Sequence, residues 1–230
     1  MAPRVSTIEK PAGAAAPHYP DNPVLVRVWR GTEIESQHRG SWVVTDPSGH
    51  VFAGAGEYAA DVFTRSSVKC LQALPLLETG AAQRFAYTDA EVALALASHN
   101  AEACHTEGVA AVLARLDLDA RALQCGAQPP GDPEAKRRLR ERGEAPTALH
   151  NNCSGKHAGF LALTRHLGAP VETYLERESA GQRLVRKAVV DMTGVDAAGL
   201  GTAIDGCSAP TFRMPLTALA QAFARVSNPS

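Results

Sequence analysis

The stretch that decides the fold is residues 65–77, RSSVKCLQALPLL, in which Ser66 and Lys69 stand three positions apart. Apolar residues at positions 68, 71, 74 and 77 predict a helix over 66–77 with one buried face. Pro75 should bend this helix or shift its end, because proline lacks the backbone N–H that a helix interior uses. The sequence patterns before and after the stretch differ, so it separates a strand-rich part from a helix-rich part.

Before this stretch, alternating apolar and polar residues predict antiparallel strands near 24–30, 33–45 and 50–54. After it, capping signals and helical periodicity dominate. The expected helices cover about residues 88–97, 106–118, 158–168, 176–193 and 215–226. We therefore expect an α/β protein of the α+β kind, with an antiparallel sheet flanked by helices in one domain over 23–230, preceded by a disordered arm over 1–22.

Composition restricts the classes of function. The chain has 230 residues, 45% of them hydrophobic, which is enough for a buried core. A net charge of -1 and 5% aromatic residues provide no basis for binding nucleic acid or an anionic membrane. The basic run KRRLRER at 136–142 is diluted by glutamates and predicts a solvated helix face. With no signal-peptide core and no apolar span, we expect a soluble, cytoplasmic protein with neither nucleic acid nor membrane as partner.

The spacing of Ser66 and Lys69 suits acyl transfer. A serine hydroxyl needs a base to become a nucleophile, and a lysine held neutral can take its proton. On a helix Ser66 shares a face with Lys69, whereas Ser67 does not. The pair alone is a weak signal, because a helix cap and a solvated lysine are the more common explanation of this spacing. Ser98, in the triplet SHN, favours catalysis, because penicillin-binding proteins and class A β-lactamases pair S-x-x-K with a similar triplet.

Two cysteines in polar, glycine-containing loops, Cys153 and Cys207, suggest a metal site with a nitrogen donor nearby. From chemistry alone His157 is the obvious third zinc ligand, because Lys156 must first lose its proton, although metal binding can drive that loss. Ordinary loop packing is the alternative. The remaining cysteines are expected to pack as small hydrophobic residues: Cys70, Cys104 and Cys125.

Five segments, taken together, resemble the rhizobial-type L-asparaginases. They occur in that family's order and span about residues 24–230. The segments are IESQHRG at 34–40, RSSVK at 65–69, ASHN at 97–100, HNNCSGKHAG at 150–159 and DGCSAP at 205–210. Five motifs in one order are far more specific than any one of them.

The resemblance implies a serine β-lactamase-like fold, a homodimer, and hydrolysis of L-asparagine to L-aspartate and ammonia. By position, Ser66 is the nucleophile, Lys69 its base and Ser98 a relay. The resemblance also implies one zinc ion and no organic cofactor. The implied zinc ligands are Cys153, Lys156 and Cys207, so the family prefers Lys156 to His157.

Four further residues are expected around the substrate. Arg39 and Arg65 are candidates for holding its α-carboxylate, because a guanidinium grips a carboxylate in a fork, with a surface salt bridge as the alternative for each. His157 and Asp205 are expected to orient ligands through hydrogen bonds.

Members of the resembled family are longer and carry a later lysine-and-glycine motif in the K-T-G position. We expect this part to lie beyond Ser230, leaving a chain that is poorly soluble and weakly active or inactive. Two other functions stay open. One is a penicillin-recognising serine acyl hydrolase, and the other is an inactive zinc-binding fragment that binds small amino acids or a partner.

Overall fold

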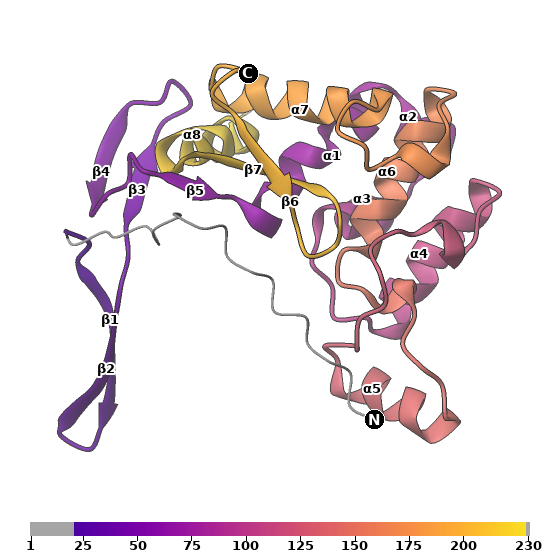
Figure 1. Ribbon diagram of the computed structural model, residues 1–230, viewed down its shortest axis with the longest axis horizontal. Helices are drawn as coiled ribbons and strands as arrows, with labels where there is room; N and C mark the ends of the chain where they lie inside the picture. The colour runs from indigo at the N-terminus through magenta and orange to yellow at the C-terminus, as the bar shows by residue number, and fades with distance from the viewer. Residues whose placement is uncertain (1–20, 229–230) are drawn as a thin grey trace, which may run out of the picture.

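The computed structural model describes residues 21–228 of the chain (Figure 1). The arm expected over 1–22 lies outside the described residues except for its last two positions. Of these, Asn22 is buried, and its side-chain oxygen accepts a hydrogen bond from the backbone N–H of Glu57 at 2.8 Å. No helix among the described residues is long and apolar enough to cross a membrane.

Strands and helices mix in the α+β manner that the sequence predicts, but the strands form three small antiparallel sheets. The first sheet pairs β1 (Val24–Arg30) with β2 (Glu33–Arg39), and the second pairs β3 (Trp42–Thr45) with β4 (Val51–Ala55). The third has the order β5-β7-β6, with β5 at Asp61–Phe63, β6 at Gly201–Ile204 and β7 at Pro210–Pro215. The single sheet flanked by helices is therefore not formed by the described residues.

The strand expected over 33–45 is divided at Gly40 and Ser41. The N–H of Gly40 donates to the carbonyl oxygen of Pro23 at 3.2 Å, which turns the chain away from the first hairpin. The β1–β2 hairpin then extends away from the helical part (Figure 1). Its apolar side chains are left exposed, among them Trp29 and Val26.

The helical part follows the predicted order with shifted boundaries. A short 3-10 helix at Arg65–Val68 precedes α1, so the helix proper begins at Lys69 and continues through Pro75. The eight α-helices of the described residues are α1 (Lys69–Glu78), α2 (Ala81–Arg84), α3 (Asp89–Leu96), α4 (Ala103–Arg115), α5 (Pro133–Arg142), α6 (Ser154–His166), α7 (Ala180–Thr193) and α8 (Leu216–Ser227). α2 was not predicted.

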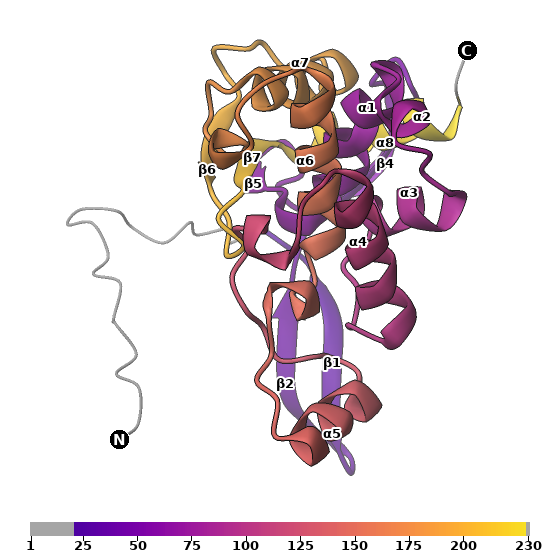
Figure 2. The same cartoon turned by 90° about the vertical axis from the view of Figure 1, so that its right-hand side faces the viewer.

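The core surrounds α6, which lies in the middle of the helical part and contacts α1, α3, α4 and α7 (Figure 2). Residues 154–164 of α6 are buried on every side of the helix. A helix that is buried all round belongs to the centre of a core rather than to its surface. Its first turn is therefore held rigidly, and that turn carries Lys156 and His157.

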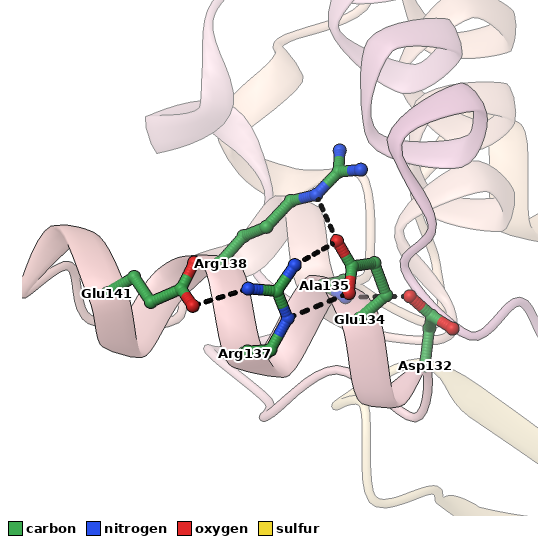
Figure 3. A network of polar contacts seen from close by, with 6 residues as sticks. All are labelled: Asp132, Glu134, Ala135, Arg137, Arg138 and Glu141. Carbon is green, nitrogen blue, oxygen red and sulfur yellow. Dashed lines mark hydrogen bonds and ion pairs between the residues drawn. The ribbon is translucent and has the colours of Figure 1, made fainter.

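α5 is the opposite case, because none of its residues is buried. The Asp132 carboxylate caps the helix by accepting from the N–H of Ala135 at 2.7 Å. Glu134 accepts from both Arg137 and Arg138 on the helix surface (Figure 3). The solvated helix face predicted for 136–142 is confirmed.

Candidate active site

Ser66 lies in the 3-10 turn that joins the third sheet to α1. β5 ends at Phe63, and Thr64 is anchored to β7 because its N–H donates to the Phe212 carbonyl oxygen at 2.9 Å. Arg65 then adopts φ +48°, a left-handed conformation that is costly for a residue with a side chain. This turn leaves Ser66 exposed while Lys69 is buried.

Lys69 is the most buried lysine of the site, with the residue 1% exposed. Nζ donates to the Ala97 carbonyl oxygen at 2.6 Å and to the Asn152 carbonyl oxygen at 3.4 Å, and lies 2.9 Å from Ser98 Oγ. Burial lowers the pKa of Lys69, because the charged form loses its hydration. A neutral amine has two N–H donors and one lone pair, which matches two carbonyls and one hydroxyl.

The structure thus brings Lys69 to Ser98, whereas no hydrogen bond within residues 21–228 joins Lys69 to the Ser66 hydroxyl. Ser66 and Lys69 do share a turn, since the backbone N–H of Lys69 donates to the Ser66 carbonyl oxygen. In a 3-10 turn, residues three apart lie one above the other, so the two side chains project from the same side.

The predicted metal ligands converge from two distant segments. Cys153 and Lys156 belong to the start of α6, and Cys207 belongs to the loop between β6 and β7. All three are buried, and Lys156 Nζ lies 3.2 Å from Cys207 Sγ. A hydrogen bond from the Cys153 thiol, together with His157 and Lys156, lowers the pKa of Cys207. Donating that bond, with burial, raises the pKa of Cys153, so the cluster favours one thiol and one thiolate.

His157 lies against the same thiolate and is fully buried. The Tyr174 hydroxyl accepts from the N–H of Gln124 at 2.8 Å and lies 2.7 Å from His157 Nδ1. Nε2 of His157 makes no hydrogen bond with the described residues. Burial lowers the pKa of His157, so its ring is a neutral donor or ligand rather than a cation.

One cavity joins the serine turn to the thiol cluster. Its volume is about 240 Å³, and it is lined by Arg65, Ser66, Gln128, Asn151, Asn152, Cys153, Asp205, Gly206 and Cys207. This is smaller than the space that drug-sized ligands use, and it suits a small polar molecule. Two larger hollows, of about 460 and 630 Å³, lie away from this site against α5 and around Asp119.

The two predicted arginines have different surroundings. Nε of Arg65 is 3.1 Å from a carboxylate oxygen of Asp205, at the rim of the cavity. Arg39 lies at the base of the exposed hairpin, where its guanidinium donates to the carbonyl oxygen of Asn22 at 2.8 Å. The structure therefore brings Arg65 and Asp205 to the cavity and does not bring Arg39 there.

Sequence reasoning assigned no role to Asn151 and Asn152. The Asn151 amide donates to the carbonyl oxygens of Cys125 and Gly126 at 2.9 and 3.1 Å, while its oxygen accepts from the N–H of Cys153 at 2.9 Å. The carbonyl of Asn152 accepts from Lys69. The only sequence signal was their position directly before Cys153 in a polar motif.

A second cluster of metal-binding side chains lies elsewhere. Ligand atoms of Glu102, Cys104 and His105 fall within 4.8 Å of one another at the start of α4. Nδ1 of His105 already accepts from the N–H of Glu102 at 3.2 Å, which is a helix-capping contact. The positive end of a helix dipole also disfavours a cation, so capping explains this cluster.

A buried lysine beside a serine and a small polar cavity suit a hydrolase. The chain belongs to a family of amidohydrolases that act on a small-molecule substrate. That family is L-asparaginase II, whose family model matches residues 26–230. A search of curated proteins finds no match to the chain. Membership in the family supports L-asparaginase activity in general.

Proposed function

We propose that this chain is a rhizobial-type L-asparaginase with a serine β-lactamase-like site, which hydrolyses L-asparagine to L-aspartate and ammonia through an ester on Ser66. The proposal depends above all on the environment of Lys69. Its amine is buried, has a lowered pKa, and lies 2.9 Å from Ser98 Oγ. A lysine whose pKa is lowered in this way gives up its proton more readily and can act as a base.

The proton path runs from Ser66 through Ser98 to Lys69. In the neutral amine that the proposal requires, the two carbonyls around Lys69 Nζ take its N–H donors, and its lone pair is left to accept from the Ser98 hydroxyl 2.9 Å away. Ser98 then receives the proton of Ser66 as Ser66 attacks the side-chain amide carbon of asparagine. The substrate brings the two hydroxyls together, as catalytic hydrogen bonds often tighten only in the complex.

Collapse of the tetrahedral intermediate breaks the C–N bond, and ammonia leaves with the proton returned through Ser98. Backbone N–H groups stabilise the oxyanion. Water then cleaves the aspartyl ester, with Lys69 again taking the proton, and Ser66 is regenerated. The small cavity favours an amino-acid amide over a larger substrate.

The residues present fit a zinc ion. Two buried sulfurs, one favoured as a thiolate, and a lysine nitrogen 3.2 Å away form the soft donor set that zinc prefers. Cys153, Lys156 and Cys207 would hold the ion, with His157 as the alternative nitrogen ligand. When bound, zinc would provide a positive charge that orients the amino-acid end of the substrate.

Arg65 is the better candidate for the substrate α-carboxylate, because it lines the cavity and its guanidinium is paired with Asp205 on one side only. A fork-shaped guanidinium can hold a second carboxylate. Arg39 retains this role only if the hairpin folds toward the site. The homodimer and the cytoplasmic location stay predictions, and light scattering tests the first.

Ammonia release from L-asparagine by the purified chain tests the proposal. Ser66→Ala should abolish release, while Ser67→Ala, whose hydroxyl bonds the Thr64 carbonyl, is the matched control and should retain it. If Ser66→Ala releases ammonia at the wild-type rate, Ser66 is not the nucleophile. Covalent labelling by a fluorescent penicillin without ammonia release would favour a penicillin-recognising enzyme instead.

A further inference from the structure

His99 is a buried histidine that the proposed reaction does not use. It follows Ser98 in the loop after α3 and is 5% exposed. Its Nδ1 accepts from the N–H of Ala101 at 3.1 Å, so in the neutral ring the proton is on Nε2. Nε2 therefore donates to Ser154 Oγ at 2.8 Å, and Ser154 donates to the Leu149 carbonyl oxygen at 3.0 Å.

A second link joins the same two segments through the backbone. The N–H of His99 donates to the carbonyl oxygen of Asn152 at 3.2 Å. That carbonyl also accepts from Lys69 Nζ at 3.4 Å. The loop that carries Ser98 is thus bound to residues 152–154 by one side-chain contact and one backbone contact, on either side of Cys153.

The surroundings of His99 preserve this arrangement near neutral pH. Burial, with the nearby His105, Lys69 and His150, lowers the pKa of His99 to about 4. His105 of α4 stacks on the ring with centroids 5.2 Å apart. A protonated ring would lose the acceptor that Ala101 uses, so the neutral ring is the one that fits both partners.

We infer that His99 is a positioning residue, which holds the Ser98 loop on the first turn of α6 and thereby keeps Ser98 Oγ against the Lys69 amine. It also fixes the serine and lysine groups relative to the thiol cluster, because Cys153 lies inside the linked segment. The expected loss of kcat in His99→Ala rests on the proposed function. The expected change in the pKa of Lys69 does not.

The first test is kinetic. His99→Ala should lower kcat by on the order of 10- to 100-fold, with KM changed less than about threefold, because a misplaced base affects the transition state more than binding. His99→Gln should recover most of the loss, since its amide can donate to Ser154. Wild-type kcat in His99→Ala, measured where circular dichroism shows both proteins folded, would overturn the inference.

Two further variants separate the link from simple packing. His105→Ala removes the stacked ring but neither link, and kcat should stay within about twofold of wild type. In a Ser154→Ala background, His99→Ala should have a much smaller effect than alone, because the shared hydrogen bond is already lost. Fully additive effects of His99→Ala and Ser154→Ala would contradict the link.

The last test needs no turnover. Competitive acetylation over a pH series reports the pKa of Lys69, and His99→Ala should raise it toward the ordinary lysine value as the loop loosens and water enters. An unchanged labelling curve would refute the inference. If the wild-type chain releases no ammonia but His99→Ala still raises the pKa of Lys69, the inference stands and the proposed function alone is refuted.

Discussion

Gly155 of α6 passes Leu94 of α3 so closely that no side chain fits between them. A Cβ on Gly155 would stand 2.3 Å from the Leu94 carbonyl oxygen. One turn later the contact relaxes, because a Cβ on Gly159 would meet Ala95 at an ordinary 3.4 Å. Close approach at Gly155 sets the position of the α6 turn that carries Lys156.

Gly155→Ala should therefore destabilise the protein by about 3 kcal/mol, because backbone atoms of α3 or α6 must move to admit the methyl group. Gly159→Ala is the matched control and should be neutral or slightly stabilising, since alanine favours helix over glycine. Urea unfolding followed by circular dichroism measures both. Equal midpoints for the two variants would contradict the close contact.

Lys69→Met should lower kcat by roughly 10³-fold or more, because the proposed general base is lost. It should also destabilise the fold by about 1–3 kcal/mol, because the Ala97 and Asn152 carbonyls lose their donor. Steady-state ammonia release and thermal unfolding measure the two effects. Lys136→Met on the exposed α5 is the control and should change neither.

The rate should rise with pH through the lowered pKa of Lys69, because the base acts only when it is deprotonated. The acid limb of the kcat profile should therefore lie below the ordinary lysine value of 10.5. If the acid side of the profile instead gives a pKa of 10.5, burial does not lower the pKa of this amine. Ser98→Ala, which removes the hydroxyl beside Nζ, should shift the limb as well as lower kcat.

Stability should fall on acidification between about pH 6.5 and pH 4 because of His99. The folded-state pKa is lowered from 6.5 to about 4, so the unfolded chain binds the proton more readily in this window. The stability that neutral His99 contributes is fully present above its pKa in the unfolded chain, and it is lost as the pH falls toward its pKa in the folded protein. Melting temperatures over this range should drop less steeply for His99→Gln, and parallel curves would contradict the assignment.

Metal binding should distinguish Lys156 from His157. Titration with Co²⁺ should give a thiolate charge-transfer band in the wild type that Cys207→Ser removes. Of Lys156→Met and His157→Asn, the variant that loses the band identifies the nitrogen ligand. Cys125→Ala is the matched control, because this buried thiol bonds the Ala148 carbonyl, and it should retain the band.

The sequence predicted the elements whose patterns are local. In the strand at 24–30, apolar and polar residues alternate, and turn residues lie beside both this strand and the one at 51–55. The ends of α7 and α8 also lie within a few residues of the predicted ones. β5, β6 and β7 were missed, because each is short and β7 is buried at almost every position, so it does not alternate. The helix boundary at Lys69 was missed because the left-handed conformation of Arg65 has no sequence signature.

For the site, motif order indicated which residues gather but not how. The contact of Lys156 with Cys207 agrees with the predicted pairing of their segments. The Lys69 amine contacts Ser98, which the motifs had already named as a relay, but also two backbone carbonyls that they did not name, 28 and 83 positions away. Such contacts depend on tertiary packing, and neither spacing nor periodicity encodes them.

The three-stranded sheet has a consequence for redesign. β5 leads into the turn of Ser66, and β7 follows the loop of Cys207, and these two strands pair through their backbones. The separation between Ser66 and Cys207 is therefore set in part by main-chain hydrogen bonds, which side-chain replacement leaves in place. Replacing Gln128 in the cavity wall by a smaller residue would make room for a longer amide while β5 and β7 still hold Ser66 and Cys207 at the same separation.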